Sequence, residues 1–144
     1  MKHETLLSRV LANPSVGEAL AKAVSGACSA PDFSGRWVNE LHSSMELTVR
    51  GTSVSGKYTS AVSGEGGTVS GPIIGYVAGD VIAFSVLWPG ATPSITSWVG
   101  QLVTENGEQT LDTLWHLIVN ASDAQDPNSI WTTIHAGADS FKRR

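Results

Sequence analysis

Apolar and polar residues alternate along most of the chain from residue 33 onward. In the segment 35–41, Trp37, Asn39 and Leu41 occupy every second position and therefore share one face of an extended chain. The same period of two recurs in later segments, and no helical period intervenes between them. The pattern predicts eight β-strands, at residues 35–41, 45–50, 54–60, 68–76, 80–88, 94–105, 109–120 and 130–141.

Turn-forming residues separate these segments at short intervals. The pair Asn106-Gly107 lies between two long segments and is the best short-range hairpin signal in the chain. Pro72 lies within its predicted strand and favours an edge, a bend or a break there. Eight consecutive strands at this spacing are typical of a sandwich or an antiparallel up-and-down barrel. The fold class is therefore all-β, and a closed eight-stranded barrel would have room inside for one small ligand.

The first 31 residues differ in character from the rest. Apolar residues between positions 6 and 11 recur at helical spacing until Pro14 interrupts them. Small residues at 25–27 would suit a signal-peptide cleavage site, but charged residues such as Glu4 and Arg9 break up the apolar centre that a signal needs. We expect an N-terminal extension at 1–31, helical or disordered, and a barrel domain at 32–144. Both an extracytoplasmic and a cytoplasmic location remain open.

Composition narrows the classes of function. The 144 residues suit one domain of ordinary size. Apart from the last three residues, 142–144, the chain has no cluster of cations, so nucleic-acid binding is not expected. No apolar run approaches the roughly 20 residues that span a bilayer. The single cysteine, Cys28, excludes an internal disulfide and a cysteine-rich metal site.

The face that carries the tryptophans is not an ordinary core. A sealed core would hold valine, isoleucine and leucine, whereas here short polar groups share the face with three indoles. Burying such groups without partners would cost about 1–3 kcal/mol each, so we expect a hydrogen-bonding ligand or ordered water to satisfy them. Indole walls with a few convergent polar groups indicate a small-molecule pocket. The polar members are Asn39, Ser43, Tyr58, Ser60, Thr96 and Asp139, and the indoles are those of Trp88, Trp98 and Trp115.

Four short runs in this order resemble successive motifs of the avidin/streptavidin family. They are GRWVNEL at 35–41, GKYTSAV at 56–62, TSWVGQ at 96–101 and DSF at 139–141. Trp88, Trp115 and Trp131 fall where the family pattern has its remaining tryptophans. Each motif alone is weak, but all of them in order over roughly residues 33–141 are a strong signal. The resemblance implies an avidin-like barrel.

The resemblance also implies that the chain sequesters biotin with high affinity and without catalysis. Asn39, Ser43 and Tyr58 would donate hydrogen bonds to the ureido oxygen of the ligand. Ser60 and Asp139 would accept hydrogen bonds from the two ureido N–H groups. Biotin is thus the implied ligand, at the open end of the barrel, with no further cofactor and no metal.

Other matching residues would surround the rest of the ligand. Thr96 would approach the ring sulfur, and Ser94 would meet the carboxylate. Trp131 resembles the tryptophan that caps the site of a neighbouring subunit, which implies a homo-oligomer, most often a tetramer, with a dimer as the alternative. The apolar residues expected to enclose the ligand are Leu41, Val62, Trp88, Trp98, Trp115 and Leu117. Trp37 is expected in the barrel core, and Phe84 stands where the family often has tryptophan.

Three other functions share parts of this pattern. A lipocalin-like carrier also opens its first strand with Gly-x-Trp, as at 35–37, but lines its cup with apolar residues. An enzyme would need a nucleophile beside a base or two facing carboxylates, and only Asp139 faces inward. The third is an avidin-like barrel with weakened biotin binding. His42 and His116 are expected on the surface or at an interface, and His135 in the core or at an interface.

Overall fold

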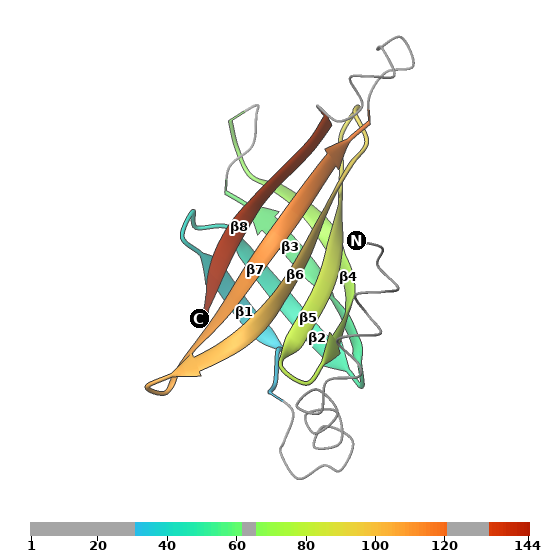
Figure 1. Cartoon of the computed structure of the whole chain (residues 1–144). Helices are drawn as coiled ribbons and strands as arrows, with labels where there is room; N and C mark the ends of the chain where they lie inside the picture. The colour runs from blue at the N-terminus through green and yellow to red at the C-terminus, as the bar shows by residue number, and fades with distance from the viewer. Residues whose placement is uncertain (1–30, 62–65, 121–132) are drawn as a thin grey trace, which may run out of the picture. The chain divides into compact units, whose positions relative to one another are not determined.

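Eight antiparallel strands close into a barrel in a computed structural model that describes residues 31–61, 66–120 and 133–144. Each strand pairs with the next along the chain, and β1 pairs with β8 to complete the ring (Figure 1). The prediction of an all-β up-and-down barrel is therefore confirmed. The strands are β1 (Gly35–Asn39), β2 (Ser44–Arg50), β3 (Ser53–Ser60), β4 (Val69–Ala78), β5 (Val81–Trp88), β6 (Ser94–Glu105), β7 (Glu108–Val119) and β8 (Ile134–Arg143).

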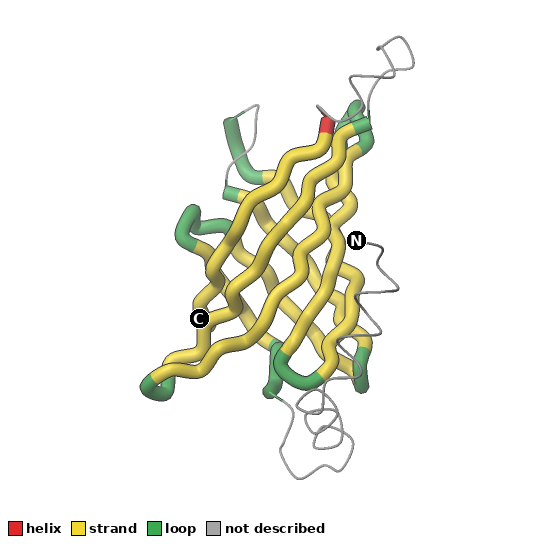
Figure 2. The backbone as a smooth tube through the Cα atoms, in the orientation of Figure 1, coloured by secondary structure: helices red, strands yellow, loops and turns green. Residues whose placement is uncertain are grey.

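Strand pairing covers most of the described chain (Figure 2). The longest hairpin joins β6 to β7 through Asn106 and Gly107, whose φ angles of 51° and 82° are those of a type I′ turn. This turn suits the right-handed twist of the two strands, and it confirms the hairpin that the sequence predicts. No helix in the described part of the chain is both long and apolar enough to span a lipid bilayer.

The first strand is shorter than predicted because its last residue caps the turn that follows. The Asn39 side-chain Oδ1 accepts hydrogen bonds from the backbone N–H groups of Leu41 and Ser43, at 3.1 and 2.8 Å. His42 completes this turn with a φ of 64°, in the left-handed region. The pairing of β1 with β2 ends at Val38, and Leu41 lies in the turn rather than on a strand.

Pro72 does not break its strand, which is one of the three outcomes that the sequence predicts. It lies inside β4, opposite Lys57 on β3, in a strand that continues on both sides of it. The pairing of β4 with β5 begins one residue later, at Ile73, so the missing N–H falls at the end of that ladder. The closed ring leaves β4 between two neighbours, and the proline is accommodated by its position along the strand.

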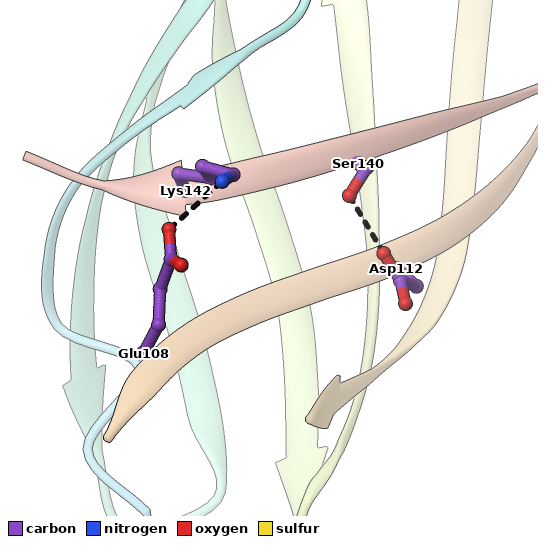
Figure 3. A network of polar contacts seen from close by, with 4 residues as sticks. All are labelled: Glu108, Asp112, Ser140 and Lys142. Atoms are coloured by element: carbon purple, nitrogen blue, oxygen red, sulfur yellow. Dashed lines mark hydrogen bonds and ion pairs between the residues drawn. The ribbon is translucent and has the colours of Figure 1, made fainter. Parts of the chain in front are cut away.

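The last strand ends later than predicted, at Arg143 instead of residue 141. It starts at Ile134, whereas residues 130–132 of the predicted strand lie outside the described residues. It continues to Arg143 because its final residues find partners on β7 (Figure 3). Lys142 Nζ lies 2.8 Å from Glu108 Oε1, and Ser140 Oγ donates to Asp112 Oδ1 at 2.7 Å. Such exposed contacts add little stability, but they lie along the β7–β8 ladder.

The end of the barrel where β1 begins is filled by protein. Trp37 is fully buried there, and its Nε1 donates to the backbone oxygen of Phe33 at 2.9 Å. The guanidinium of Arg143 lies 4.4 Å from the centroid of the Trp37 ring and donates to Gln109 Oε1 at 3.0 Å. Trp37 is thus a core residue, as predicted, and this end of the barrel is closed by side chains of the protein itself.

Charge is distributed unevenly over the outer surface. The outward positions of β1–β3 carry charged residues, including Arg36, Glu46 and Lys57. The outward positions of β5–β8 carry two cross-strand rows of apolar residues and, between them, one row of mostly polar but uncharged residues. These rows are Ala83–Val99–Leu114–Ala138, Leu87–Ile95–Ile118–Ile134 and Ser85–Ser97–His116–Ala136. Leu87, Val99 and Leu114 are each more than half exposed in the single chain. We call this surface the β5–β8 face.

Candidate functional site

Most of the predicted polar residues and indoles line one cavity, which we call the cup. The cup has a volume of about 160 Å³ and lies at the end of the barrel opposite Trp37. Six strands and the β1–β2 turn contribute to its wall. The lining residues are Asn39, Leu41, Ser43, Tyr58, Ser60, Trp88, Thr96, Trp98, Trp115, Leu117 and Asp139. Eleven of the fourteen residues singled out from the sequence therefore lie together.

The remaining three have different positions. Ser94 lines a wider cavity of about 800 Å³ that continues the cup toward solvent. Val62 and Trp131 lie outside the described residues. Leu41 lines the cup from the β1–β2 turn and is 58% exposed, so it is a rim residue and not the inward strand residue that its parity predicts.

Asp139 is held by donors from two other strands. Trp98 Nε1 donates to Asp139 Oδ2 at 2.9 Å, and Asn39 Nδ2 donates to Oδ1 at 3.4 Å. Burial raises the pKa of Asp139, and the nearby charge of Glu40 raises this pKa further, while the two hydrogen bonds lower it. The carboxylate therefore gains from any further donor that enters the cup.

Tyr58 lies at the centre of the aromatic wall. Its ring stacks on Trp98 with centroids 4.9 Å apart, and it meets Trp88 edge to face at 5.7 Å. On the far side of Trp98, Phe84 stacks at 5.1 Å, so a phenylalanine supports the indole at the position where the family often has tryptophan. Burial is the main reason that the pKa of Tyr58 is raised well above its ordinary value. Its hydroxyl is therefore protonated and able to donate.

Thr96 is oriented by an indole. Trp88 Nε1 donates to Thr96 Oγ1 at 2.8 Å, and Thr96 is buried. Because this bond uses an acceptor site of the hydroxyl, the hydroxyl proton is directed elsewhere. Thr96 is thus prepared to act as a donor toward a group in the cup.

The polar groups are not orphaned, contrary to the expectation from the sequence. Among the described residues, no buried side-chain nitrogen or oxygen lacks a hydrogen-bond partner. Ser43 Oγ, for example, accepts from the backbone N–H of Ala61 at 3.0 Å, and Asn39 Oδ1 is used by its own turn. The groups satisfy one another, and what they offer a ligand is their remaining capacity. That capacity includes the proton of the Thr96 hydroxyl and the carboxylate lone pairs of Asp139.

Gly137 does not line the cup but supports one of its indoles, and it carries no side chain by which sequence analysis would find it. It pairs with Trp115 across the β7–β8 ladder. A Cβ at this position would lie 2.4 Å from Trp115 Cζ2, so only glycine leaves room for the indole. The one signal in the sequence is a glycine inside a strand directly opposite a tryptophan.

The histidines lie away from the cup. His42 and His116 are exposed, as predicted for surface positions. His135 is exposed as well, so the core alternative is wrong, and the alternative of an interface position stays a prediction. It pairs with Leu117 near the start of β8, where the barrel wall ends and an inward position already reaches solvent. None of the three lines the cup.

Comparison with known proteins identifies one family that the chain matches in sequence. The family model described as "Avidin family" matches residues 27–144. Afifavidin from Afifella pfennigii is 33% identical over 142 residues, which cover 94% of this chain and 84% of that protein.

Solved structures agree with the sequence match. The crystal structure of Xenavidin is similar with a TM-score of 0.69 at 27% identity, covering 81% of this chain and 100% of that one. The biotin complex of short afifavidin is similar with a TM-score of 0.62 at 31% identity, covering 88% and 98% of the two chains. The resemblance of the four motifs is thus confirmed over most of the sequence, and the chain belongs to the avidin family.

Proposed function

We propose that this chain binds biotin in the cup and holds it without chemical change. The observation that carries the proposal is the convergence of Asn39, Ser43, Tyr58, Ser60 and Asp139 on one cavity walled by indoles. A cyclic urea has one strong acceptor and two donors in a plane, and this set supplies donors and acceptors to match. Family membership and the biotin complex of a relative 31% identical in sequence support the proposal.

The polar residues act on opposite edges of the urea. Asn39 Nδ2 and the hydroxyls of Ser43 and Tyr58 donate to the ureido oxygen, while Ser60 and Asp139 accept from the two N–H groups. Asp139 contributes most because a hydrogen bond to an ionised acceptor is roughly twice as strong as one between neutral groups. Trp98 holds this carboxylate in place through Nε1.

The rest of the wall acts on the sulfur-containing ring and its chain. Thr96 donates toward the thioether, with its hydroxyl oriented by Trp88. Ser94 meets the end of the chain in the outer cavity. The ring system is enclosed by Leu41, Trp88, Trp98, Trp115 and Leu117. We retain Val62 as a further contact and Trp131 as the cap of a neighbouring subunit's site.

We also propose that the chain forms a homo-oligomer through the β5–β8 face. This surface is apolar and nearly uncharged. In the single chain it is exposed to solvent, as the 60% exposure of Leu114 illustrates. A tetramer is the expected state, with a dimer as the alternative. Light scattering coupled to size-exclusion chromatography, on the wild type and on Leu114→Glu, tests this interface. A wild-type monomer at micromolar concentration would contradict it. We propose further that residues 1–31 form an extension distinct from the barrel domain at 32–144.

Titration with biotin tests the proposed function directly. We expect saturable binding with one biotin per chain by calorimetry, and quenching of tryptophan fluorescence because three indoles line the cup. Tyr58→Phe keeps the aromatic stack but removes one donor, so the affinity should fall by about 3- to 10-fold. Lys57→Ala, on the outward face of β3, is the matched control and should leave the affinity unchanged. A wild type that ignores biotin but binds an apolar probe such as retinol would favour a lipocalin-like carrier instead.

A further inference from the structure

The side chain of Glu40 provides a hydrogen-bond acceptor at the point where β1 ends. Between β1 and β8, the Arg144 N–H donates to the backbone oxygen of Arg36 at 2.9 Å, and the same register places Ser140 opposite Glu40. β1 ends at Asn39, one residue before Glu40, and the Ser140 N–H donates instead to the carboxylate Oε2 of Glu40 at 3.1 Å. The carboxylate therefore takes the part of the backbone carbonyl that a continued strand would have used.

Ser140 is held on both sides, and it directly follows Asp139 in the chain. Its Oγ donates to Asp112 Oδ1 on β7 at 2.7 Å (Figure 3), while its N–H donates to Glu40. Because a peptide unit is planar, the Ser140 N–H lies in one plane with the backbone carbonyl of Asp139. The hydrogen bond to Glu40 thus restrains the backbone that carries the Asp139 carboxylate to the cup.

Glu40 also directly follows Asn39, which caps the β1–β2 turn through its Oδ1. In the proposed binding mode Asn39 donates to the ureido oxygen, and Asp139 accepts from an ureido N–H. The direct bond from Asn39 Nδ2 to Asp139 Oδ1 measures 3.4 Å, which is longer than a typical N–H···O distance and holds the two side chains only weakly. The bond between Glu40 and Ser140 therefore joins the backbones beside two residues that act on opposite edges of the ligand.

The charge of Glu40 acts against ionisation of Asp139. Burial is the main cause of the raised pKa of Asp139, and the negative charge of Glu40 raises this pKa further. This is the largest effect of a charged side chain on that carboxyl group. Glu40 and Asp139 also border one groove on the outside of the barrel, which agrees with their proximity.

Other ionisable groups on the adjoining strands do not take this role. Tyr58 shares the cup with Asp139, but its pKa is raised well above its ordinary value, so it stays protonated. β6 carries no ionisable residue between positions 94 and 104. The further ionisable groups toward this end of the barrel do not line the cup; they are Lys57 on β3, Asp112 and His116 on β7, and His135 on β8.

Building on the proposed function, we propose that Glu40 is a positioning residue of the biotin site, whose carboxylate fixes the backbone beside Asp139 and sets how far the affinity falls in acid. Its two effects have opposite consequences. The hydrogen bond to Ser140 strengthens retention of the ligand, whereas the charge favours protonation of Asp139 and weakens binding at low pH.

Two substitutions separate these effects. Glu40→Gln keeps an oxygen that can accept from the Ser140 N–H and removes the charge, whereas Glu40→Ala removes both. Glu46→Gln and Glu46→Ala, on the outward face of β2, make the same changes in charge and size away from the cup and are the matched controls.

A carbon-13 NMR titration of the Asp139 carboxyl group in the ligand-free protein tests the effect of the charge. Both Glu40 variants should have a lower pKa of Asp139 than the wild type, and both Glu46 variants should titrate like the wild type. The ratio of the dissociation constants for biotin at pH 5 and pH 8 should be about 1.5- to 5-fold smaller in Glu40→Gln than in the wild type. An unchanged pKa of Asp139 in both Glu40 variants overturns the effect of the charge.

The rate of biotin release tests the positioning role. At pH 8, radiolabelled biotin chased with unlabelled biotin should leave Glu40→Ala about 3- to 10-fold faster than the wild type, because one hydrogen bond that restrains the site is lost. Glu40→Gln should restore release to within about 2-fold of the wild type, because its amide oxygen can still accept from Ser140. Release from Glu40→Ala at the wild-type rate, or release from Glu40→Gln as fast as from Glu40→Ala, overturns the positioning role.

Failure of this proposal can be distinguished from failure of the proposed function. A wild type that does not bind biotin overturns the proposed function itself. A wild type that binds biotin, together with Glu40 variants that match it in both the titration and the release rate, overturns only the role of Glu40.

Discussion

Replacing Asp139 by asparagine should weaken ligand binding and stabilise the barrel at the same time. The substitution keeps the size of the side chain and removes its charge. Trp98 Nε1 donates to one carboxylate oxygen at 2.9 Å, and an asparagine oxygen at that position preserves this bond. The bond from Asn39 to the other oxygen is long, at 3.4 Å, so little is lost when an amide nitrogen takes its place.

The loss of affinity follows from the change in acceptor. A hydrogen bond to a charged group contributes about 1.5–3 kcal/mol, which corresponds to about 10- to 150-fold in the dissociation constant for biotin. The asparagine also turns an N–H group toward the urea edge where an acceptor is needed. Calorimetric titration at pH 8 measures the change. Asp112→Asn, on the outward face of β7, is the matched control and should bind like the wild type.

The gain in stability follows from the direction of the pKa shift. Burial raises the pKa of Asp139 in the folded chain above its unfolded value. Stabilisation from such a group is complete below the unfolded pKa and is lost as the pH rises through the folded pKa. The asparagine variant should therefore have a higher Tm than the wild type at pH 8 and a similar Tm near pH 3. A lower Tm at pH 8 together with unchanged affinity would refute this reasoning.

Three further predictions concern the same wall. Affinity for biotin should fall as the pH drops through the raised pKa of Asp139, because protonation removes the ionised acceptor; titrations between pH 4 and pH 8 measure this fall, which Asp139→Asn should abolish. Trp88→Phe keeps an aromatic wall but releases the hydroxyl of Thr96, so it should weaken biotin by about 3- to 10-fold and weaken desthiobiotin, which lacks the sulfur, less. An equal loss of affinity for biotin and for desthiobiotin would show that Trp88 acts only by lining the cup and not by orienting Thr96. Gly137→Ala should displace Trp115, cost about 1–3 kcal/mol in chemical denaturation and weaken biotin; a fully stable variant would show that the indole has room to move.

The strands and the parity of their residues could be predicted because closure of the barrel makes a period of two obligatory. Trp98, Thr96 and Tyr58 face inward in the structure as the alternation requires. Asn106-Gly107 predicts its turn because only residues that tolerate positive φ fit there.

The remaining features depend on atoms that parity does not specify. Alternation places Asn39 inward but does not reveal that its oxygen caps a turn, which in turn removes Leu41 from the strand. It likewise places Trp88 and Trp98 without indicating which acceptor each N–H reaches. The exposure of His135 follows from where the wall ends, a three-dimensional property of the barrel rim. The partners and directions of these hydrogen bonds are set by the folded structure and are not specified by the alternation of the sequence.

The ring of strands is closed by its shortest ladder. β1 pairs with β8 only through Trp37–Arg143, Val38–Lys142 and Asn39–Phe141, whereas β6 and β7 run together along their whole length. Amide hydrogen exchange should accordingly begin at this junction, where the fewest bonds must break before the cylinder unrolls. A ligand that binds both Asn39 on β1 and the carboxylate of Asp139 on β8 would connect the two strands across this junction. Ligand binding should slow amide exchange in these two strands far more than in the β6–β7 hairpin. Dissociation of the ligand and opening of the barrel would then be a single kinetic event.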